Sequence, residues 1–497
     1  SLTALGVYAQ TRKKVYADYH GIRTTRELDG SFNQWKYASL TSGTSNGPKS
    51  ITYNPDIILE NGRREIAAAS YPLVGVQSQY DPDYLEYQIL SAKASKIDGF
   101  WIEWGYIDHS SNILLKAMQP IAERYGFEVG VNICDAWLFA NDWITSVRPE
   151  INTREKKKEY FKECIQYLIN NVFTGKTTPS VNGNPVLYLF GGGINPNEME
   201  WIENQTYNYP SGTTFPVILK RVTPTGSITN NNYIPGSPLN AASQWVNTSI
   251  MPTSWMPERR RKGTPTSSFP TYDYYALGSD AVAYLEGFKN EIWTDASYAV
   301  RSGFVAPGMD NIGCANWSDA NAIFYKIARN NGDTYRNMWK YNVDNKDKLD
   351  MVYIGSWSDY TEGHEIEPTI ENGDRELRTT LQYAALFKNE QADDSGIGLP
   401  KILFEQRKRL AFCFKFDKNI SSIGSQLSIA GLRIAEGRYS EASSILTETE
   451  ASIKTIEQGI RKNEFRIEND KLTIAGNSSN PSQGEYILDG SRFGIGL

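Results

Sequence analysis

The sequence predicts an α/β protein built as a (β/α)8 TIM barrel with long loop insertions and a C-terminal helical appendage. From about residue 82 onward, short apolar runs of strand length alternate with amphipathic stretches of helical length, which is typical of a parallel sheet covered by helices. Roughly eight such units fit in the first ~390 residues, which matches an eight-stranded barrel. An open doubly wound sheet is the alternative, but no predicted strand leads into a dinucleotide-binding or phosphate-binding glycine motif.

The predicted strands are short runs of apolar, β-branched and aromatic residues. They cover residues 15–21, 98–105, 127–133, 185–193, 215–222, 299–308 and 351–357. Residues 223–275 are rich in Pro, Ser, Thr, Asn and Gly, and the alternation is lost there. One further strand is expected near residues 241–246 to complete the eight.

The predicted helices carry apolar residues three and four positions apart. They cover residues 81–97, 112–126, 154–173, 197–205, 280–293, 334–343 and 374–387. Asp81 is placed to cap the first helix, and Pro120 falls inside the second, where proline is unfavourable.

We interpret residues 1–400 as the barrel domain and residues 401–497 as the helical appendage. Helical periodicity occurs over residues 401–416, 426–439 and 440–462. The appendage contains no cluster of carboxylates and aromatic residues, so we expect it to have a structural role. The alternative is that it docks a protein partner, which an exposed apolar stripe on its helices would indicate.

The charge distribution argues against a nucleic-acid partner. The net charge is -6, from 51 basic and 57 acidic residues, and the basic run at residues 258–262 is short enough to be a solvated loop. There is no apolar run of about 18 residues, so we expect no membrane span. Aromatic residues make up 12% of the chain, and the faces and polar edges of tyrosine and tryptophan suit sugar rings, which favours a carbohydrate partner. The sequence does not indicate the oligomeric state.

The four cysteines, Cys134, Cys164, Cys314 and Cys413, are scattered and have no histidine at ligand spacing. This pattern excludes a disulfide framework and does not match a zinc site, so we expect no metal and no other cofactor. The chain opens at Ser1 without an initiator methionine, which we interpret as a processed or trimmed N-terminus. We expect an exported protein that is periplasmic, secreted or held at the cell surface, although no export signal is visible.

Acidic and aromatic residues gather at the carboxyl ends of five predicted strands, which is where barrels of this kind build their sites. One such residue alone is usually a helix cap or an ion-pair partner, but five strand ends of about eight favour a shared cleft. We predict that substrate is bound there by Tyr19, His20, Glu103, Trp104, Asp135, Asp310, Trp357 and Tyr360.

Paired carboxylates with aromatic walls are typical of glycoside hydrolysis. One carboxylic acid protonates the leaving oxygen, while the other, ionised, activates water or attacks the sugar. Two acids on one loop, as in residues 357–368, can be tuned apart by mutual repulsion and unequal burial. A Ser–His–Asp set competes poorly, because the three histidines, His20, His109 and His364, are not accompanied by a Gly-x-Ser-x-Gly motif.

Three segments resemble signatures of glycoside hydrolase families 71 and 99 and their bacterial relatives. Residues 357–368, WSDYTEGHEIEP, are similar to W-N-(D/E)-(W/Y)-x-E-G-T-x-I-E-P. Residues 71–104, which begin YPLVGVQSQYDP and end KIDGFWIEW, are similar to the segment that begins HPL-G-YDSSDP and ends K-AGIDGFVVDW. Residues 305–310, VAPGMD, are similar to P-G-(F/Y)-D, a weaker signal. The similarity covers much of residues 1–390 and none of 401–497.

The resemblance implies that Asp359 and Glu362 are the catalytic carboxylates, with Glu362 as general acid and Asp359 as base. Family 71 carries an Asp-x-x-Glu pair in inverting enzymes that cut α-1,3-glucan. Family 99 carries a Glu-x-x-Glu pair in retaining endo-α-mannosidases, where the first carboxylate deprotonates the sugar's 2-hydroxyl. The aspartate here follows family 71, and its shorter side chain leaves room for a water, so we expect inversion on an α-linked glucan or mannan. Ser358 and His364 depart from the Asn and Thr common in these families.

Two alternatives remain open. One is a carbohydrate-binding barrel without activity, which the retained pair Asp359 and Glu362 argues against. The other is a retaining enzyme of the endo-α-mannosidase type. The resemblance favours the fold and a carbohydrate substrate more strongly than it favours one linkage.

Overall fold

The computed structural model describes most of the chain. The longer described ranges are residues 12–36, 53–190, 193–210, 212–222, 248–252, 288–296, 300–314, 325–415 and 420–461. The shorter ones are residues 274–276, 282, 285–286, 298, 465–468, 471–474 and 486–487. Within these residues, none of the helices has the length and apolar composition needed to cross a membrane.

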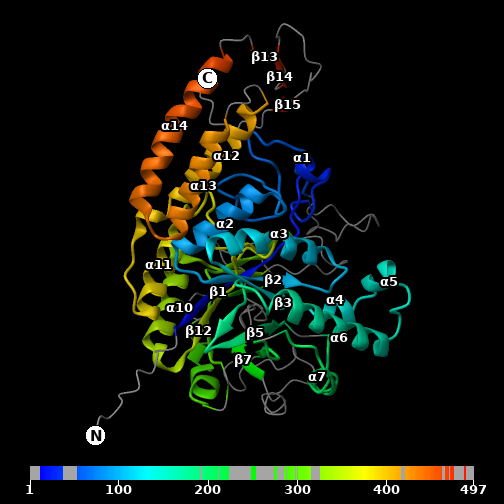
Figure 1. Cartoon of the computed structure of the whole chain (residues 1–497). Coiled ribbons are helices and arrows are strands. Elements are labelled where there is room, and N and C mark those ends of the chain that lie inside the picture. Colours follow the sequence, from blue (N-terminus) through cyan, green and yellow to red (C-terminus); the bar gives the residue numbers. More distant parts are fainter. Residues whose placement is uncertain are drawn as a thin grey trace.

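The predicted (β/α)8 barrel is confirmed. In the described part of the chain its parallel strands are β1 (Lys14–Tyr19), β2 (Gly99–Trp104), β3 (Glu128–Ile133), β5 (Asn184–Leu189), β6 (Val217–Val222), β7 (Thr248–Pro252), β9 (Ser302–Val305) and β12 (Met351–Ile354). They pair in the order β7-β6-β5-β3-β2-β1-β12-β9, and β4 (Ser180–Val181) adds to β5 in the antiparallel direction. Because β7 and β9 at the two ends of this order also contact each other, the sheet curls into a barrel with helices around it (Figure 1).

Each predicted strand outside residues 223–275 contains a barrel strand, generally shorter than expected. The expected strand near residues 241–246 lies outside the described residues, and the strand that takes this place in the barrel is β7, a few residues later. The predicted strand at 351–357 ends early, because β12 stops at Ile354 and the chain turns into the loop that carries Asp359.

The helices that cover the barrel follow the predicted segments closely. They are α2 (Pro82–Ala94), α3 (Ser110–Tyr125), α6 (Arg154–Asn171), α7 (Pro196–Glu203), α10 (Asp333–Asp344) and α11 (Arg375–Lys388). Asp81 caps α2 as predicted, accepting a hydrogen bond from the Asp83 backbone N–H at 3.0 Å. Pro120 is accommodated within α3, which continues to Tyr125. The predicted helix at 280–293 is described only in part, and its end, Lys289–Trp293, is a π-helix.

Large aromatic rings fill the barrel interior. The Trp101 ring lies 4.9 Å from that of Tyr16, 5.1 Å from that of Tyr353 and 6.1 Å from that of Tyr188, measured between centroids. Because side chains alternate along a strand, Asp18 and Glu103, two residues beyond Tyr16 and Trp101, share their inward face. The rings therefore form a floor, and the next inward positions toward the carboxyl ends of the strands are acidic.

The C-terminal helices α12 (Leu399–Cys413), α13 (Ser421–Ala435) and α14 (Tyr439–Arg461) pack on one another and on the barrel (Figure 1). α12 lies along α2, and α13 contacts both α2 and α3. The Arg407 guanidinium on α12 forms an ion pair with the buried Glu86 carboxylate on α2, with Nη2 2.9 Å from Oε1. Three short strands follow that the periodicity did not predict, β13 (Phe465–Glu468), β14 (Lys471–Ile474) and β15 (Tyr486–Ile487).

Candidate active site

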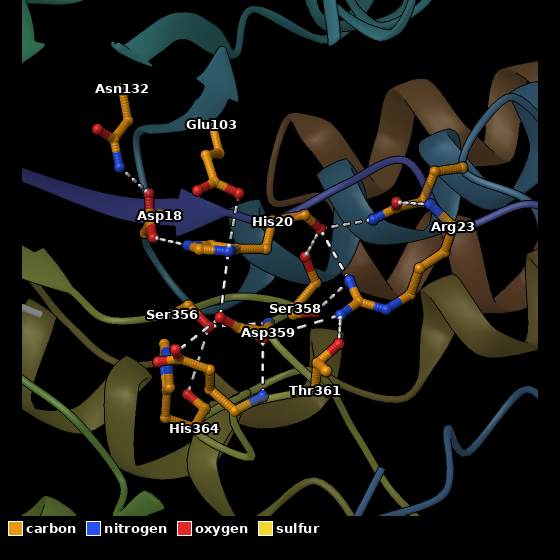
Figure 2. A network of polar contacts seen from close by, with 12 residues as sticks. Asp18, His20, Arg23, Glu103, Asn132, Ser356, Ser358, Asp359, Thr361 and His364 are labelled. Carbon is orange, nitrogen blue, oxygen red and sulfur yellow. Dashed lines mark hydrogen bonds and ion pairs between the residues drawn. The ribbon is translucent and has the colours of Figure 1, made fainter. Parts of the chain in front are cut away.

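The loop after β12 brings its carboxylates against the ends of β1 and β2. We call Asp18, His20, Glu103, Asp359, Glu362 and His364 the carboxylate–histidine cluster. Figure 2 shows its centre, where the His20 ring lies between Asp18, Glu103 and Asp359. The cluster thus lies at the carboxyl end of the barrel, where the sequence predicted a site.

A tight turn sets the positions of Asp359 and Glu362. The Glu362 backbone N–H donates to Oδ1 of Asp359 at 3.0 Å, and the Asp359 backbone N–H donates to Oγ of Ser356 at 2.9 Å. Gly363 closes the turn with a φ of +68°, and a Cβ there would lie 2.2 Å from the carbonyl oxygen of Asp310. The turn therefore requires the glycine that follows Glu362 in the sequence.

The His20 ring faces carboxylates on both sides. Its Nε2 lies 2.5 Å from Oδ2 of Asp18, and its Nδ1 lies 3.1 Å from both Oε2 of Glu103 and Oδ2 of Asp359. A carboxylate can only accept a hydrogen bond, so both ring nitrogens must carry protons and His20 is an imidazolium. Burial lowers the pKa of His20, but Glu103, Asp18 and Asp359 together raise it well above its ordinary value.

Two further cations approach Asp359. Nε2 of His364 lies 3.3 Å from Oδ2 of Asp359 and 3.4 Å from Oε2 of Glu362. Burial lowers the pKa of His364, but Asp359 and Glu362 raise it to about 9. On the other side, Nη2 of Arg23 lies 3.8 Å from Oδ1 of Asp359.

The environments of the two catalytic candidates differ. Burial would raise the pKa of Asp359, but the charges of His20, His364 and Arg23 hold it well below its ordinary value, so Asp359 is ionised. Oε2 of Glu362 is buried and, within the described part of the chain, accepts no hydrogen bond. Burial also raises the pKa of Glu103, against the lowering effect of His20.

The other two acids of this loop hold it in place. Glu365 pairs with Arg329, whose Nη2 lies 2.8 Å from Oε1. Glu367 accepts hydrogen bonds from the hydroxyls of Tyr84 at 2.8 Å and Tyr360 at 2.9 Å, and burial raises its pKa to about 7. Of the four acids in the segment 357–368, two therefore face the cluster and two anchor the loop.

Asp359, Glu362 and His364 lie close enough together to bind one metal cation. One ligating atom each from Asp359, Glu362 and His364 lies within 4.8 Å of the others. However, these carboxylates already face the imidazolium rings of His20 and His364 and the Arg23 guanidinium, so the protein supplies their countercharges itself. The donor set is better explained as an ion-pair network than as a metal site.

Four predicted substrate-binding residues have side chains buried away from the cluster. The Tyr19 hydroxyl donates to Gln88 on α2, and Nε1 of Trp104 donates to Asn112 on α3. Trp357 packs on Phe100, and Tyr360 lies beside Trp35 and donates to Glu367. The alternation of β1 and β2 turns Tyr19 and Trp104 outward, and Trp357 and Tyr360 pack beneath the loop after β12. A substrate contact by any of these four rings stays a prediction.

Asp135 and Asp310 form contacts that hold neighbouring loops. Oδ2 of Asp135 accepts hydrogen bonds from the backbone N–H groups of Gly193 and Ile194, at 2.9 and 2.6 Å. Asp310 lies on β10 (Met309–Asp310), with Oδ2 2.9 Å from Nζ of Lys326, and its backbone N–H donates to the carbonyl of Glu362. A substrate contact by either aspartate stays a prediction.

Several members of the site were not predicted. Asp18 is held by Asn132 and by the Tyr353 hydroxyl, which donate to its Oδ1 at 2.9 and 2.7 Å. Both Asp18 and Asn132 are polar residues at inward positions of otherwise apolar strands, a signal that could have identified them. Arg23 and His20 lie more than 300 residues before Asp359 and His364 in the chain. The sequence gives no signal that these four residues meet.

The cluster reaches solvent on one side. The Asp359 and Glu362 side chains are 4% exposed, whereas those of His20 and Glu103 are 15% exposed. A ligand would therefore first meet the side formed by His20 and Glu103.

Comparisons with known proteins support the fold. No protein-family model and no curated protein matches the sequence. Among solved structures, the family 99 endo-α-mannosidase of Bacteroides thetaiotaomicron aligns with a TM-score of 0.51 at 15% identity, over 76% of this chain and 98% of that chain. A complex of that endo-α-mannosidase with bis-tris propane gives 0.49 at 15% identity, over 76% and 97%. A protein described as glycoside hydrolase-like gives 0.46 at 14% identity, over 75% and 94%. This chain thus has the barrel fold of a family 99 glycoside hydrolase.

Proposed function

We propose that the protein is a glycoside hydrolase that cleaves an α-linked oligo- or polysaccharide with Asp359 and Glu362. The observation that carries the proposal is the pair itself, two carboxylates on one turn at the carboxyl end of the barrel, in unequal electrostatic environments. Separate tuning of two acids is what general acid catalysis beside an ionised carboxylate requires. The fold shared with an endo-α-mannosidase adds support.

The geometry supports distinct roles for the two carboxylates. Asp359 faces three cationic groups that favour its ionised form, which suits it to act as nucleophile or to stabilise positive charge on the sugar. Oε2 of Glu362 has no hydrogen-bond partner in the described residues and is available to deliver a proton to the leaving oxygen. His20 acts through Asp359, and His364 acts through both Asp359 and Glu362, so both histidines are positioning residues.

We infer retention rather than the inversion expected from the sequence, because the two carboxylates approach each other closely. An oxygen of Asp359 and an oxygen of Glu362 lie within 4.8 Å of each other. Retaining enzymes hold their carboxyl groups ~5–5.5 Å apart and inverting enzymes ~6.5–9.5 Å apart, to admit a water. The turn that bonds the Glu362 N–H to Asp359 draws the two side chains together despite the shorter aspartate.

The competing function is a carbohydrate-binding barrel without activity. The near-complete burial of Asp359 and Glu362 is the observation that favours it, because a substrate must gain access past His20 and Glu103. A glycan that co-purifies uncleaved with the wild-type protein would support this alternative.

The experiment that tests the proposal is a screen of α-mannans and α-glucans for newly released reducing ends, followed by proton NMR of the first-formed anomer. Cleavage of at least one α-linked polymer, with the α-anomer formed first, is the expected result. A β-anomer formed first would instead support the inverting, family 71-like assignment. Absence of cleavage across both classes of polymer would contradict the proposal.

A further inference from the structure

Trp143 is an outlier among the tryptophans of this protein. It is 53% exposed, whereas every other tryptophan in the described residues is buried or half-buried. An exposed indole leaves a large apolar face in water, and such faces commonly mark a binding surface. Trp143 begins α5 (Trp143–Val147), a short helix that Figure 1 shows at the edge of the molecule beyond α4 (Ala136–Phe139).

Trp143 extends a row of rings that begins beside Gly105, just past the end of β2. Its ring centroid lies 6.2 Å from that of Trp137 on α4, and the Trp137 centroid lies 4.9 Å from that of His109. We call His109, Trp137 and Trp143 the aromatic ridge. The ridge rests on the end of β2, since a Cβ at Gly105 would lie 3.1 Å from both the His109 and the Trp137 ring. Gly105 is two residues from Glu103, which forms the solvent-facing side of the cluster.

The ridge also carries polar groups that can form hydrogen bonds with the hydroxyls of a sugar. Nδ1 of His109 accepts a hydrogen bond from the Ser111 backbone N–H at 3.2 Å, so the ring is neutral and carries its proton on Nε2. Burial lowers the pKa of His109 to about 4, in agreement with this neutral form. Asp142, whose side chain is 89% exposed, directly precedes Trp143 and offers acceptor oxygens.

We propose that the aromatic ridge is a distal binding subsite for a pyranose ring of the glycan whose bond is cleaved at Asp359 and Glu362. The inference rests on the proposed function. A sugar presents one C–H face to an aromatic ring and hydroxyls at its rim, and the ridge offers both kinds of partner beside Gly105, two residues beyond Glu103. The place of the ridge, two residues beyond Glu103 along the chain, favours a glycan over a protein partner, because one glycan chain could then occupy the cluster and the ridge together.

The test compares Trp143→Ala with the matched control Leu386→Ala, which removes a side chain equally exposed at 54% but on α11. On the polymer that the wild type cleaves, Trp143→Ala raises KM roughly threefold to tenfold and leaves kcat unchanged, since ring contacts are worth ~0.5–1.5 kcal/mol. On a short aryl glycoside of the same sugar, which cannot reach α5, neither constant changes. Trp143→Phe recovers part of the loss, and the Leu386 control has no effect.

A second readout separates failure of this proposal from failure of the proposed function. Native gels cast with α-mannan or α-glucan retard the Glu362→Gln protein, and Trp143→Ala reduces the retardation whether or not the wild type cleaves the polymer. Unchanged KM together with unchanged retardation would overturn the ridge assignment. An equal loss on short and long substrates, which would mean an indirect effect on the cluster, would also overturn it. So would a Glu362→Gln protein that neither polymer retards.

Discussion

We expect the His20 ring to stay positively charged above neutral pH, because both of its ring nitrogens face carboxylates. The chain contains three histidines, so selective 15N labelling of histidine yields three resolvable rings. At about pH 8 we expect His20 and His364 to be imidazolium and His109 to be neutral with its proton on Nε2. His20→Gln assigns the first set of signals. A His20 ring with one unprotonated nitrogen at this pH would contradict the geometry of the cluster.

His364 makes stability depend on pH. Its ordinary pKa of 6.5 is raised to about 9 in the folded protein. A raised pKa means that the contribution is fully present below pH 6.5 and is lost as pH rises through about 9. The free energy of unfolding of the wild type should therefore fall over this window, by on the order of 3 kcal/mol from this group. Denaturant titrations of wild type and His364→Asn at several pH values check this, and an equal pH dependence in both proteins would refute it.

Of the residues that the sequence singled out, the acids Glu103, Asp359 and Glu362 lie together in the cluster, whereas the tyrosine and tryptophan rings pack outside it. Asp359 and Glu362 could be predicted because their motif and their place after a strand agree. Tyr19 and Trp104 lie away from the cluster for one reason, since a shift of one residue along a strand turns a side chain to the other face. Asp18, one residue from Tyr19, is the inward neighbour that belongs to the cluster.

At the scale of elements, the α2–α12 contact depends on a buried ion pair. Glu86 is 4% exposed and receives hydrogen bonds from Arg407 and from the Tyr125 hydroxyl. Arg407→Met leaves this carboxylate buried without its cation, so we expect it to lower the free energy of unfolding by ~3–5 kcal/mol. The double variant Arg407→Met with Glu86→Gln should recover most of the loss in denaturant titrations.

The matched control is Arg438→Met, which removes an exposed ion pair with Glu441. Exposed pairs contribute at most ~1 kcal/mol, so this variant should unfold at nearly the wild-type midpoint. Equal destabilisation by Arg407→Met and Arg438→Met would show that burial of Glu86 is not the cause.

Helices with clear apolar periodicity could be predicted from the sequence, but the elements on which they pack could not. The helices 154–173 and 374–387 match α6 and α11 closely because each buries one face. The periodicity of the C-terminal helices, in contrast, does not say what they pack on. α2 is buried on most of its surface because α3, α12 and α13 all pack on it, and the apolar pattern of α2 alone does not identify these partners.

At the scale of the whole molecule, the C-terminal helices and the site are connected. Phe404 on α12 packs on Tyr84 and Tyr87 of α2, and the Tyr84 hydroxyl donates to Glu367 in the loop that carries Asp359. A chain truncated after Gly398 should therefore lose thermal stability and catalytic activity together. A soluble truncated protein with full activity would show that residues 1–400 form an independent domain.

If Asp359 and Glu362 hydrolyse a glycosidic bond, the release of reducing ends depends on the Glu362 carboxyl group. Reducing ends released from α-mannan and α-glucan are compared for wild type, Glu362→Gln and the exposed control Glu123→Gln on α3. The amide keeps the shape of Glu362 but cannot donate its proton, so its rate should fall ~10²–10⁴-fold while fold and glycan binding persist. The control should match the wild type. Near wild-type release by Glu362→Gln would contradict the account.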